Sequence, residues 1–229
     1  MATLLPRFAT KISTASVSDI NSDPSLGGAL TLETQGSFSV VYAPFDYVNT
    51  AAKVVLVGIT PGRQQAVNAL VEARRQLVLG NSLDAAAKAA KEVASFSGAM
   101  RSSLVGMLDH IKLAPKLGLA SCSALFGAGA GLVHYTSALR YPVYVDGQNY
   151  SGNPSITRHP MLARQVGEYL AEEARLLPDA VWIPLGPAPT LALGMLANQG
   201  TIQSSRILAG LPHPSGANDL PLLSGPALI

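Results

Sequence analysis

The most constraining feature of the chain is the run Lys53-Val-Val-Leu-Val-Gly58, in which β-branched and aliphatic residues follow one another without polar alternation. Such a run predicts a strand that is buried on both faces, as in a parallel sheet covered by helices. Pro61-Gly62 ends the run, and apolar residues then recur at helical spacing between Val67 and Leu77. A buried strand, a tight turn and an amphipathic helix in succession predict one strand–helix unit.

The same pattern recurs along the chain. Further strand-like runs lie at 132–136, 180–185 and 206–211, and helical patterns lie at 83–93, 100–111 and 162–170. A small hairpin around residues 34–36 is expected to join strands at 30–32 and 38–42. Short apolar strands alternating with helices predict an α/β fold with three layers, α/β/α, around a mainly parallel sheet. In such folds the ligand site lies beyond the carboxyl ends of the strands.

Composition limits the class of protein. The chain has 229 residues, of which 48% are hydrophobic and 13% charged, so we expect one ordered domain over residues 1–229. The net charge is only +2, and the sequence has no basic tail or stripe. A nucleic-acid partner would therefore be bound through shape, backbone amides and capture of a base more than through lysines.

Cys122 is the single cysteine of the chain, so neither an internal disulfide nor an all-cysteine metal site can form. This fits a cytoplasmic protein, associated with the nucleoid if the source is bacterial, and we expect Cys122 to be buried and inert. Residues 117–133 are uncharged, but glycines interrupt them and they are short for a membrane span, so we expect a loop and no membrane partner. His110, His134 and His159 have no metal-like spacing and no evident partners, which favours structural or surface roles, without metal or cofactor.

Three segments carry groups suited to chemistry. In Gly58–Gln65 the glycines allow close approach of a ligand, and the following helix would aim free N–H groups at it. In Leu211–Asn218 prolines stiffen a turn after a strand-like run, and His213 there could donate a hydrogen bond to a developing anion. Within residues 141–157, the amides of Asn149 and Asn153 could pair with the edge of a base.

Together and in this order, these segments resemble the uracil-DNA glycosylase superfamily. Gly58-Ile59-Thr60-Pro61-Gly62 is similar to its first motif, Gly-x-x-Pro-Gly, and His213-Pro214-Ser215-Gly216 is similar to its His-Pro-Ser motif. Residues 95–109 resemble the Pro-Phe-Val-Gly segment of the thermophilic-type branch, and residues 180–186 resemble the strand of the family that ends in Leu-Gly. The resemblance spans residues 53–218.

The resemblance implies a four-stranded parallel sheet between helices, and a monomeric enzyme that flips uracil or another deaminated base out of DNA and hydrolyses its N-glycosidic bond. His213 would stabilise the charge that develops on uracil O2, and Phe96 would stack on the base. The backbone of Gly58, Ile59, Pro61 and Gly62 would hold the base and the attacking water. The loop entering the duplex would consist of Pro214, Ser215, Gly216, Ala217 and Asn218.

The chain departs from the family pattern at two positions. Thr60 stands where relatives often place Asp or Asn to position the water, and threonine can orient water but cannot act as a base. Ser137 stands where the thermophilic-type branch has its uracil-reading asparagine, which leaves Asn149 and Asn153 as replacement candidates. The iron–sulfur cluster of that branch cannot be built with one cysteine. Arg63 opposes the dipole at the start of its helix, which favours a phosphate or pocket contact.

Simpler interpretations stand beside these. His213 could be a turn residue, Phe96 a core residue, and Asn149 and Asn153 turn residues. Two other functions also remain open. One is a protein of the same fold that binds a base or an abasic site with weak or no cleavage, as the missing carboxylate beside Thr60 suggests. The other is an unrelated α/β enzyme that acts on a nucleotide or a small phosphate ester.

Overall fold

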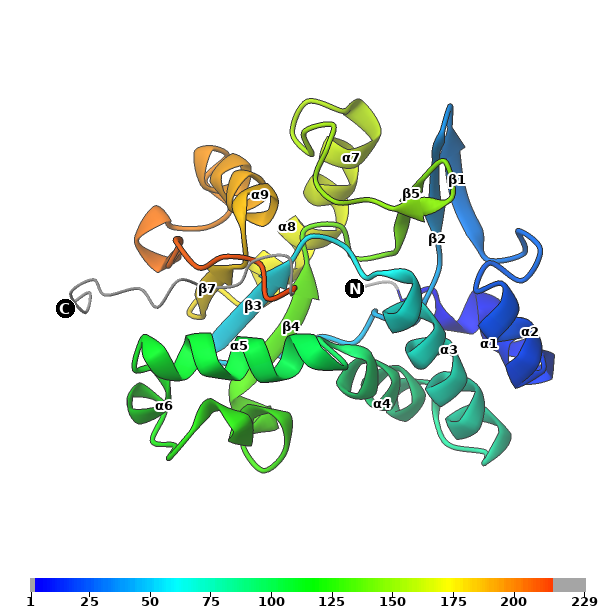
Figure 1. Ribbon diagram of the computed structural model, residues 1–229, viewed down its shortest axis with the longest axis horizontal. Coiled ribbons are helices and arrows are strands. Elements are labelled where there is room, and N and C mark those ends of the chain that lie inside the picture. Colours follow the sequence, from blue (N-terminus) through cyan, green and yellow to red (C-terminus); the bar gives the residue numbers. More distant parts are fainter. Residues whose placement is uncertain (1–2, 216–229) are drawn as a thin grey trace.

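The computed structural model describes residues 3–215 and shows a mixed α/β protein with two sheets (Figure 1). The first sheet is parallel, in the order β4-β3-β7, with β3 at Val54–Gly58, β4 at Val133–Ser137 and β7 at Val181–Pro184. Val54 lies opposite Val133 on one side and Val181 on the other. The central position of β3 explains why its sequence is apolar throughout.

The helices follow the strands as the sequence predicts. Ser82 begins one of them by accepting a hydrogen bond from the backbone N–H of Ala85 at 3.2 Å, and a proline occupies the first turn of three other helices. The helices after β3 are α3 (Arg63–Val78), α4 (Leu83–Ala94), α5 (Ala99–His110) and α6 (Leu113–Lys116). Between β4 and β7 lie α7 (Pro160–Gln165), a π-helical segment (Val166–Leu170) and α8 (Ala171–Leu176). The helix after β7 is α9 (Pro187–Asn198). Short 3₁₀ turns lie at Cys122–Phe126, Ala130–Leu132 and Ser204–Arg206.

The two faces of β3 belong to different clusters of buried side chains. Val55 and Val57 pack in a cluster that includes residues of α3 and α9, whereas Val54 and Leu56 pack with residues of α5. In Figure 1, α5 lies below the parallel sheet and α9 above it. Both faces of the strand are therefore withdrawn from water, and this apolar burial is the main favourable term in folding.

The second sheet is antiparallel, in the order β1-β2-β5-β6. Its strands are β1 (Thr31–Gln35), β2 (Phe38–Val41), β5 (Val143–Val145) and β6 (Gln148–Asn149). The predicted hairpin around residues 34–36 is confirmed as the connection between β1 and β2. Two helices precede it, α1 (Leu5–Thr14) and α2 (Val17–Ser22), and both contact α3.

The strand predicted at residues 206–211 is wrong as a continuous element. Only two isolated bridges form, from Ile207 to Trp182 and from Leu211 to Leu185. Residues 208–210 between them are exposed, and Gly210 has a φ of +118°, which is incompatible with strand geometry. The parallel sheet therefore has three strands in the described part of the chain, with a partial edge beside β7.

Residues 117–133 form turns that lead into β4, as expected. Between residues 3 and 215, no helix is both long enough and apolar enough to cross a bilayer.

Candidate functional site

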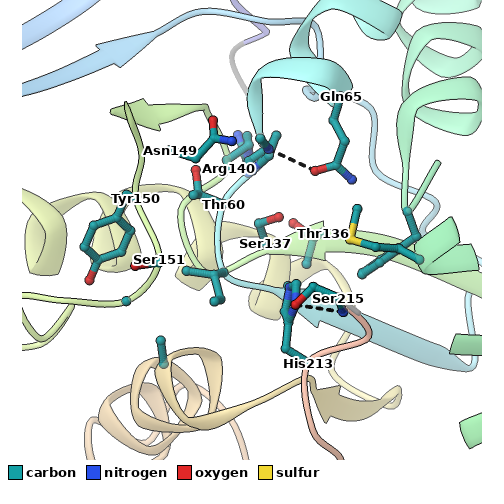
Figure 2. A pocket seen from close by; sticks show the side chains of 18 of the residues that line it. Thr60, Gln65, Thr136, Ser137, Arg140, Asn149, Tyr150, Ser151, His213 and Ser215 are labelled. Atoms are coloured by element: carbon teal, nitrogen blue, oxygen red, sulfur yellow. Dashed lines mark hydrogen bonds between the residues drawn. The ribbon is translucent and has the colours of Figure 1, made fainter. Parts of the chain in front are cut away.

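A cavity of about 590 Å³ lies at the carboxyl ends of β3 and β4. It brings together segments that are far apart in sequence (Figure 2). The residues predicted for the site that line it are Gly58, Ile59, Thr60, Pro61, Gly62, Phe96, Ser137, Asn149, Asn153, His213 and Ser215. The expectation of a site beyond the strand ends therefore agrees with the position of the cavity.

His213 enters the cavity from the turn after the partial edge strand. The N–H of Gly186 donates to the carbonyl of Leu211 at 2.9 Å, which fixes the start of this turn to the end of β7. Gly186 has a φ of +93°, and a side chain there would lie 3.4 Å from the His213 Cβ. The positive φ therefore favours glycine at 186, and His213 packs directly against it.

The protonation of His213 follows from its contacts. Its Nδ1 accepts the backbone N–H of Ser215 at 3.3 Å, and the Ser215 hydroxyl lies 3.0 Å from the same nitrogen. With Nδ1 as the acceptor, the neutral ring carries its proton on Nε2. Partial burial lowers the pKa of His213 below its ordinary value, which favours this neutral form at physiological pH.

Two N–H groups at the start of α3 already have side-chain acceptors, which the sequence did not predict. The N–H of Gly62 donates to Gln65 Oε1 at 3.0 Å, and the N–H of Arg63 donates to Asn149 Oδ1 at 2.9 Å. Side chains therefore satisfy these two donors, which a ligand would otherwise take. Arg63 is exposed and does not line the cavity, and its guanidinium donates to the carbonyl of Ser22, so its predicted phosphate contact stays a prediction.

Thr60 joins two loops. Its Oγ1 donates to the carbonyl of Tyr141 at 3.0 Å and accepts the N–H of Val143 at 3.1 Å. The one hydroxyl proton is therefore in use, and Thr60 can only accept a further hydrogen bond from a water or a ligand. Its main structural effect is to hold the first motif against the segment that leads into β5.

Phe96 is both a core residue and a wall of the cavity. It is 5% exposed, and its ring lies edge-on to Tyr135 with a centroid distance of 5.9 Å. Its φ of +48° is a left-handed conformation that bulky residues rarely adopt, and such strain is common at functional sites. A Cβ on Gly58 would lie 3.7 Å from the Phe96 ring, which is ordinary van der Waals contact, so the ring lies beside the first motif.

The remaining predicted residues lie at the rim or outside it. Asn149 is exposed, and because its Oδ1 accepts from Arg63, it presents its Nδ2 donors to the surroundings. Asn153 is exposed in the loop after β6, and Ser137 is half-buried at the end of β4. Pro214 is buried, whereas Gly216, Ala217 and Asn218 lie outside the described residues.

The uncharacterized protein YoxB of Bacillus subtilis (strain 168) is 36% identical to this chain over 221 residues, which cover 93% of the chain and 84% of YoxB. The chain belongs to the YoxB family. No model of a protein family matches it, and no solved structure matches it. For this member of the YoxB family, function therefore has to be argued from the site itself.

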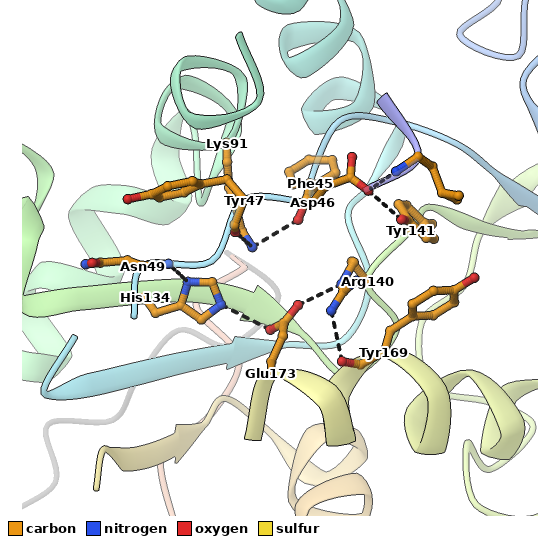
Figure 3. A network of polar contacts seen from close by, with 11 residues as sticks. Phe45, Asp46, Tyr47, Asn49, Lys91, His134, Arg140, Tyr141, Tyr169 and Glu173 are labelled. Carbon is orange, nitrogen blue, oxygen red and sulfur yellow. Dashed lines mark hydrogen bonds and ion pairs between the residues drawn. The ribbon is translucent and has the colours of Figure 1, made fainter. Parts of the chain in front are cut away.

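A buried polar network lies beside the cavity of this YoxB-family chain, and the sequence motifs gave no sign of it (Figure 3). Glu173 accepts from Arg140 Nε at 2.7 Å and from His134 Nε2 at 3.1 Å. Lys91 donates to the carbonyls of Phe45 at 3.0 Å and Tyr47 at 2.6 Å. His134, for which the sequence shows no evident partner, is thus a buried structural residue, in agreement with its predicted role.

Burial sets the charges in this network. Burial lowers the pKa of His134 to about 4 and the pKa of Lys91 to about 8. Burial alone would raise the pKa of Glu173, but the charges of Arg140 and Lys91 outweigh it and hold the carboxyl well below its ordinary range. One sequence signal was available, because Lys91 interrupts the otherwise small apolar face of α4.

Cys122, His110 and His159, which the sequence also singled out, do not line the cavity. Cys122 is buried as expected, and burial raises the pKa of its thiol to about 12. His110 is exposed. His159 packs on Phe38 with a ring distance of 4.3 Å.

Proposed function

We propose that this protein is a DNA glycosylase of the uracil-DNA glycosylase kind, which flips uracil or another deaminated base out of DNA and hydrolyses the N-glycosidic bond. The observation that carries the proposal is the environment of His213. Ser215 makes Nδ1 an acceptor, so the neutral imidazole has its donor at Nε2, within a cavity that the Phe96 ring also lines. A fixed donor and an aromatic wall are what a departing base anion needs.

The proposed chemistry depends on stabilising the leaving group. Among the described residues that line the cavity there is no carboxylate, whereas Lys91, Arg140 and His213 are all present. Donors in a secluded site favour the negative charge that spreads over the base as the bond breaks. The sugar then has the character of a cation and reacts with water without needing a strong base, so we propose that Thr60 at most accepts a hydrogen bond from that water.

The same proposal includes a finer description of the fold. We propose a three-layer α/β/α arrangement in which Ile207 and Leu211 mark a reduced fourth strand beside β7, as their bridges suggest. We also propose that the protein is a monomer with a single domain. It would act in the cytoplasm, near the nucleoid in a bacterium, and would need no cofactor. Pro214 and Ser215 would belong to the loop that contacts the duplex.

A screen for base release tests the proposal. The purified protein is incubated with single- and double-stranded oligonucleotides that contain uracil, hypoxanthine or xanthine, and abasic sites are revealed by alkaline cleavage. We expect cleavage at uracil at least. The proposal fails if none of the three bases is released from either kind of strand.

The second candidate is a protein of the same kind that binds a base or an abasic site without cleavage. The lack of a carboxylate among the described residues that line the cavity favours it, because no strong base is present there to take a proton from a water. Tight binding of abasic DNA, without turnover and unchanged in His213→Ala, would support this candidate over the enzyme.

A further inference from the structure

The hydroxyl of Thr136 lies in the wall of the cavity without a hydrogen-bond partner among the described residues. Thr136 is only 7% exposed, and its Oγ1 is buried. A buried hydroxyl without a partner costs free energy in the folded state, and such groups are uncommon in native proteins. The neighbouring Thr60 differs, because its hydroxyl both donates and accepts within the protein. Thr136 therefore has hydrogen-bonding capacity that the protein itself does not use.

Thr136 belongs to the inner part of the site. It lies on β4 opposite Val57 of β3, one residue before Ser137 (Figure 2). Lys91 also lines the cavity and is only 3% exposed, so both residues belong to the buried part of the cavity lining. The Lys91 ammonium has three protons and gives two of them to backbone carbonyls. One donor remains when the amine is protonated.

We propose that Thr136 and Lys91 read the lactam edge of a base, a ring N–H next to a carbonyl, and so select lactam bases over amino bases. This inference rests on the proposed function, because it assumes that the cavity holds a base. The Thr136 hydroxyl accepts the ring N–H, and the remaining Lys91 proton is donated to the carbonyl oxygen. Uracil, hypoxanthine and xanthine all present this edge.

Cytosine and adenine present the opposite pattern. Each has an amino group in place of the carbonyl and a ring nitrogen without a proton. Lys91 has only donors, so it would face the donors of the amino group, and a buried donor left unpaired costs binding. Thymine and guanine share the lactam edge, so Thr136 and Lys91 do not discriminate against them.

Thr136→Val is a clean test because it replaces the hydroxyl with a methyl group of similar shape. No internal hydrogen bond is lost, so we expect the melting temperature to stay the same or to rise. Thr60→Val is the matched control. It removes the same atom but breaks the bonds to Tyr141 and Val143, so we expect it to lower the melting temperature.

The first readout is single-turnover release of uracil from DNA. We expect Thr136→Val to slow release by about tenfold or more, the effect of losing one buried hydrogen bond to the substrate. If the wild type releases uracil and Thr136→Val releases it equally fast, the inference is overturned while the proposed function stands.

The second readout covers the case in which the wild type releases no base. Free uracil, hypoxanthine, cytosine and adenine are then titrated into both proteins by calorimetry at millimolar concentration. Binding of uracil and hypoxanthine in preference to cytosine and adenine, lost in Thr136→Val, would support the inference although the glycosylase proposal had failed. Equal binding of the four bases, equal binding by both proteins, or no binding at all would overturn it.

Discussion

The backbone N–H of Ser215 donates to Nδ1 of His213 across 3.3 Å, and this contact determines which ring nitrogen can donate. A backbone donor cannot be removed by changing a side chain and does not titrate. The turn therefore holds the imidazole as the Nε2–H tautomer, and protonation would place a second proton where it faces the Ser215 N–H. The expectations for pH and for mutation of the turn follow from this arrangement.

His213 should titrate at a lower pH than a free histidine. Burial lowers its pKa from the ordinary value of 6.5, so the neutral form persists below that pH in the folded protein. The unfolded chain takes up the proton first, so this residue's contribution to stability is complete above pH 6.5 and falls as the pH drops below it. We expect an NMR midpoint below 6.5 and an excision rate that is constant from neutral pH down to that midpoint. A midpoint at or above 6.5 would contradict the neutral state that burial gives His213 near neutral pH.

Phe96→Leu should impair excision more than folding. Leucine keeps much of the apolar volume, so we expect a loss of about 1–2 kcal/mol in unfolding free energy. It removes the flat ring, and loss of stacking on a base should slow excision by about tenfold or more. Phe126→Leu is the control, because Phe126 stacks on the same Tyr135 at 5.0 Å but is not part of the cavity wall. Equal effects of both variants on excision would show that Phe96 acts only as core.

Asn149→Ala should destabilise α3. It leaves the N–H of Arg63 without its acceptor, and the loss of such a cap costs about 1 kcal/mol. Asn149→Asp keeps an acceptor oxygen and adds a favourable charge near the helix start, so its stability should match the wild type. Denaturant unfolding of both variants measures this. If the alanine and aspartate variants were equally unstable, the capping role of Asn149 would be ruled out.

Glu173→Gln should be strongly destabilising. The change removes the negative charge that compensates Arg140 in a fully buried setting, and breaking a buried pair costs about 3–5 kcal/mol. The exposed pair of Lys88 and Glu92 provides the control, since Glu92→Gln should cost less than about 1 kcal/mol. Urea unfolding at pH 7 distinguishes the two. A small effect of Glu173→Gln would mean that the network contributes little to the stability of the fold.

Features determined by local sequence could be predicted. The apolar run at β3 and the helical spacing of α3 to α5 are local patterns, and their predicted bounds differ from the observed ones by a few residues. The grouping of the first motif and His213 at one end of the sheet followed from the rule that parallel strands place their carboxyl ends together, whereas the resemblance implied the position of Phe96.

Features determined by contacts between distant residues could not be predicted. Asn149 caps α3 from 86 residues away, and Glu173 pairs with Arg140 from 33 residues away. No spacing rule within the chain indicates either contact. The region 206–211 was mispredicted for a different reason, because its apolar composition suits a strand while Gly210 at positive φ interrupts it.

The most direct test is single-turnover release of uracil from a DNA oligonucleotide by the wild type and by His213→Ala. We expect the wild type to release uracil and His213→Ala to do so about 10²–10³-fold more slowly, the usual effect of removing one donor to a developing anion. Melting temperatures of the two proteins, measured alongside, separate a catalytic loss from unfolding. Absence of release by the wild type, or equal rates for the two folded proteins, would contradict the proposed role of His213.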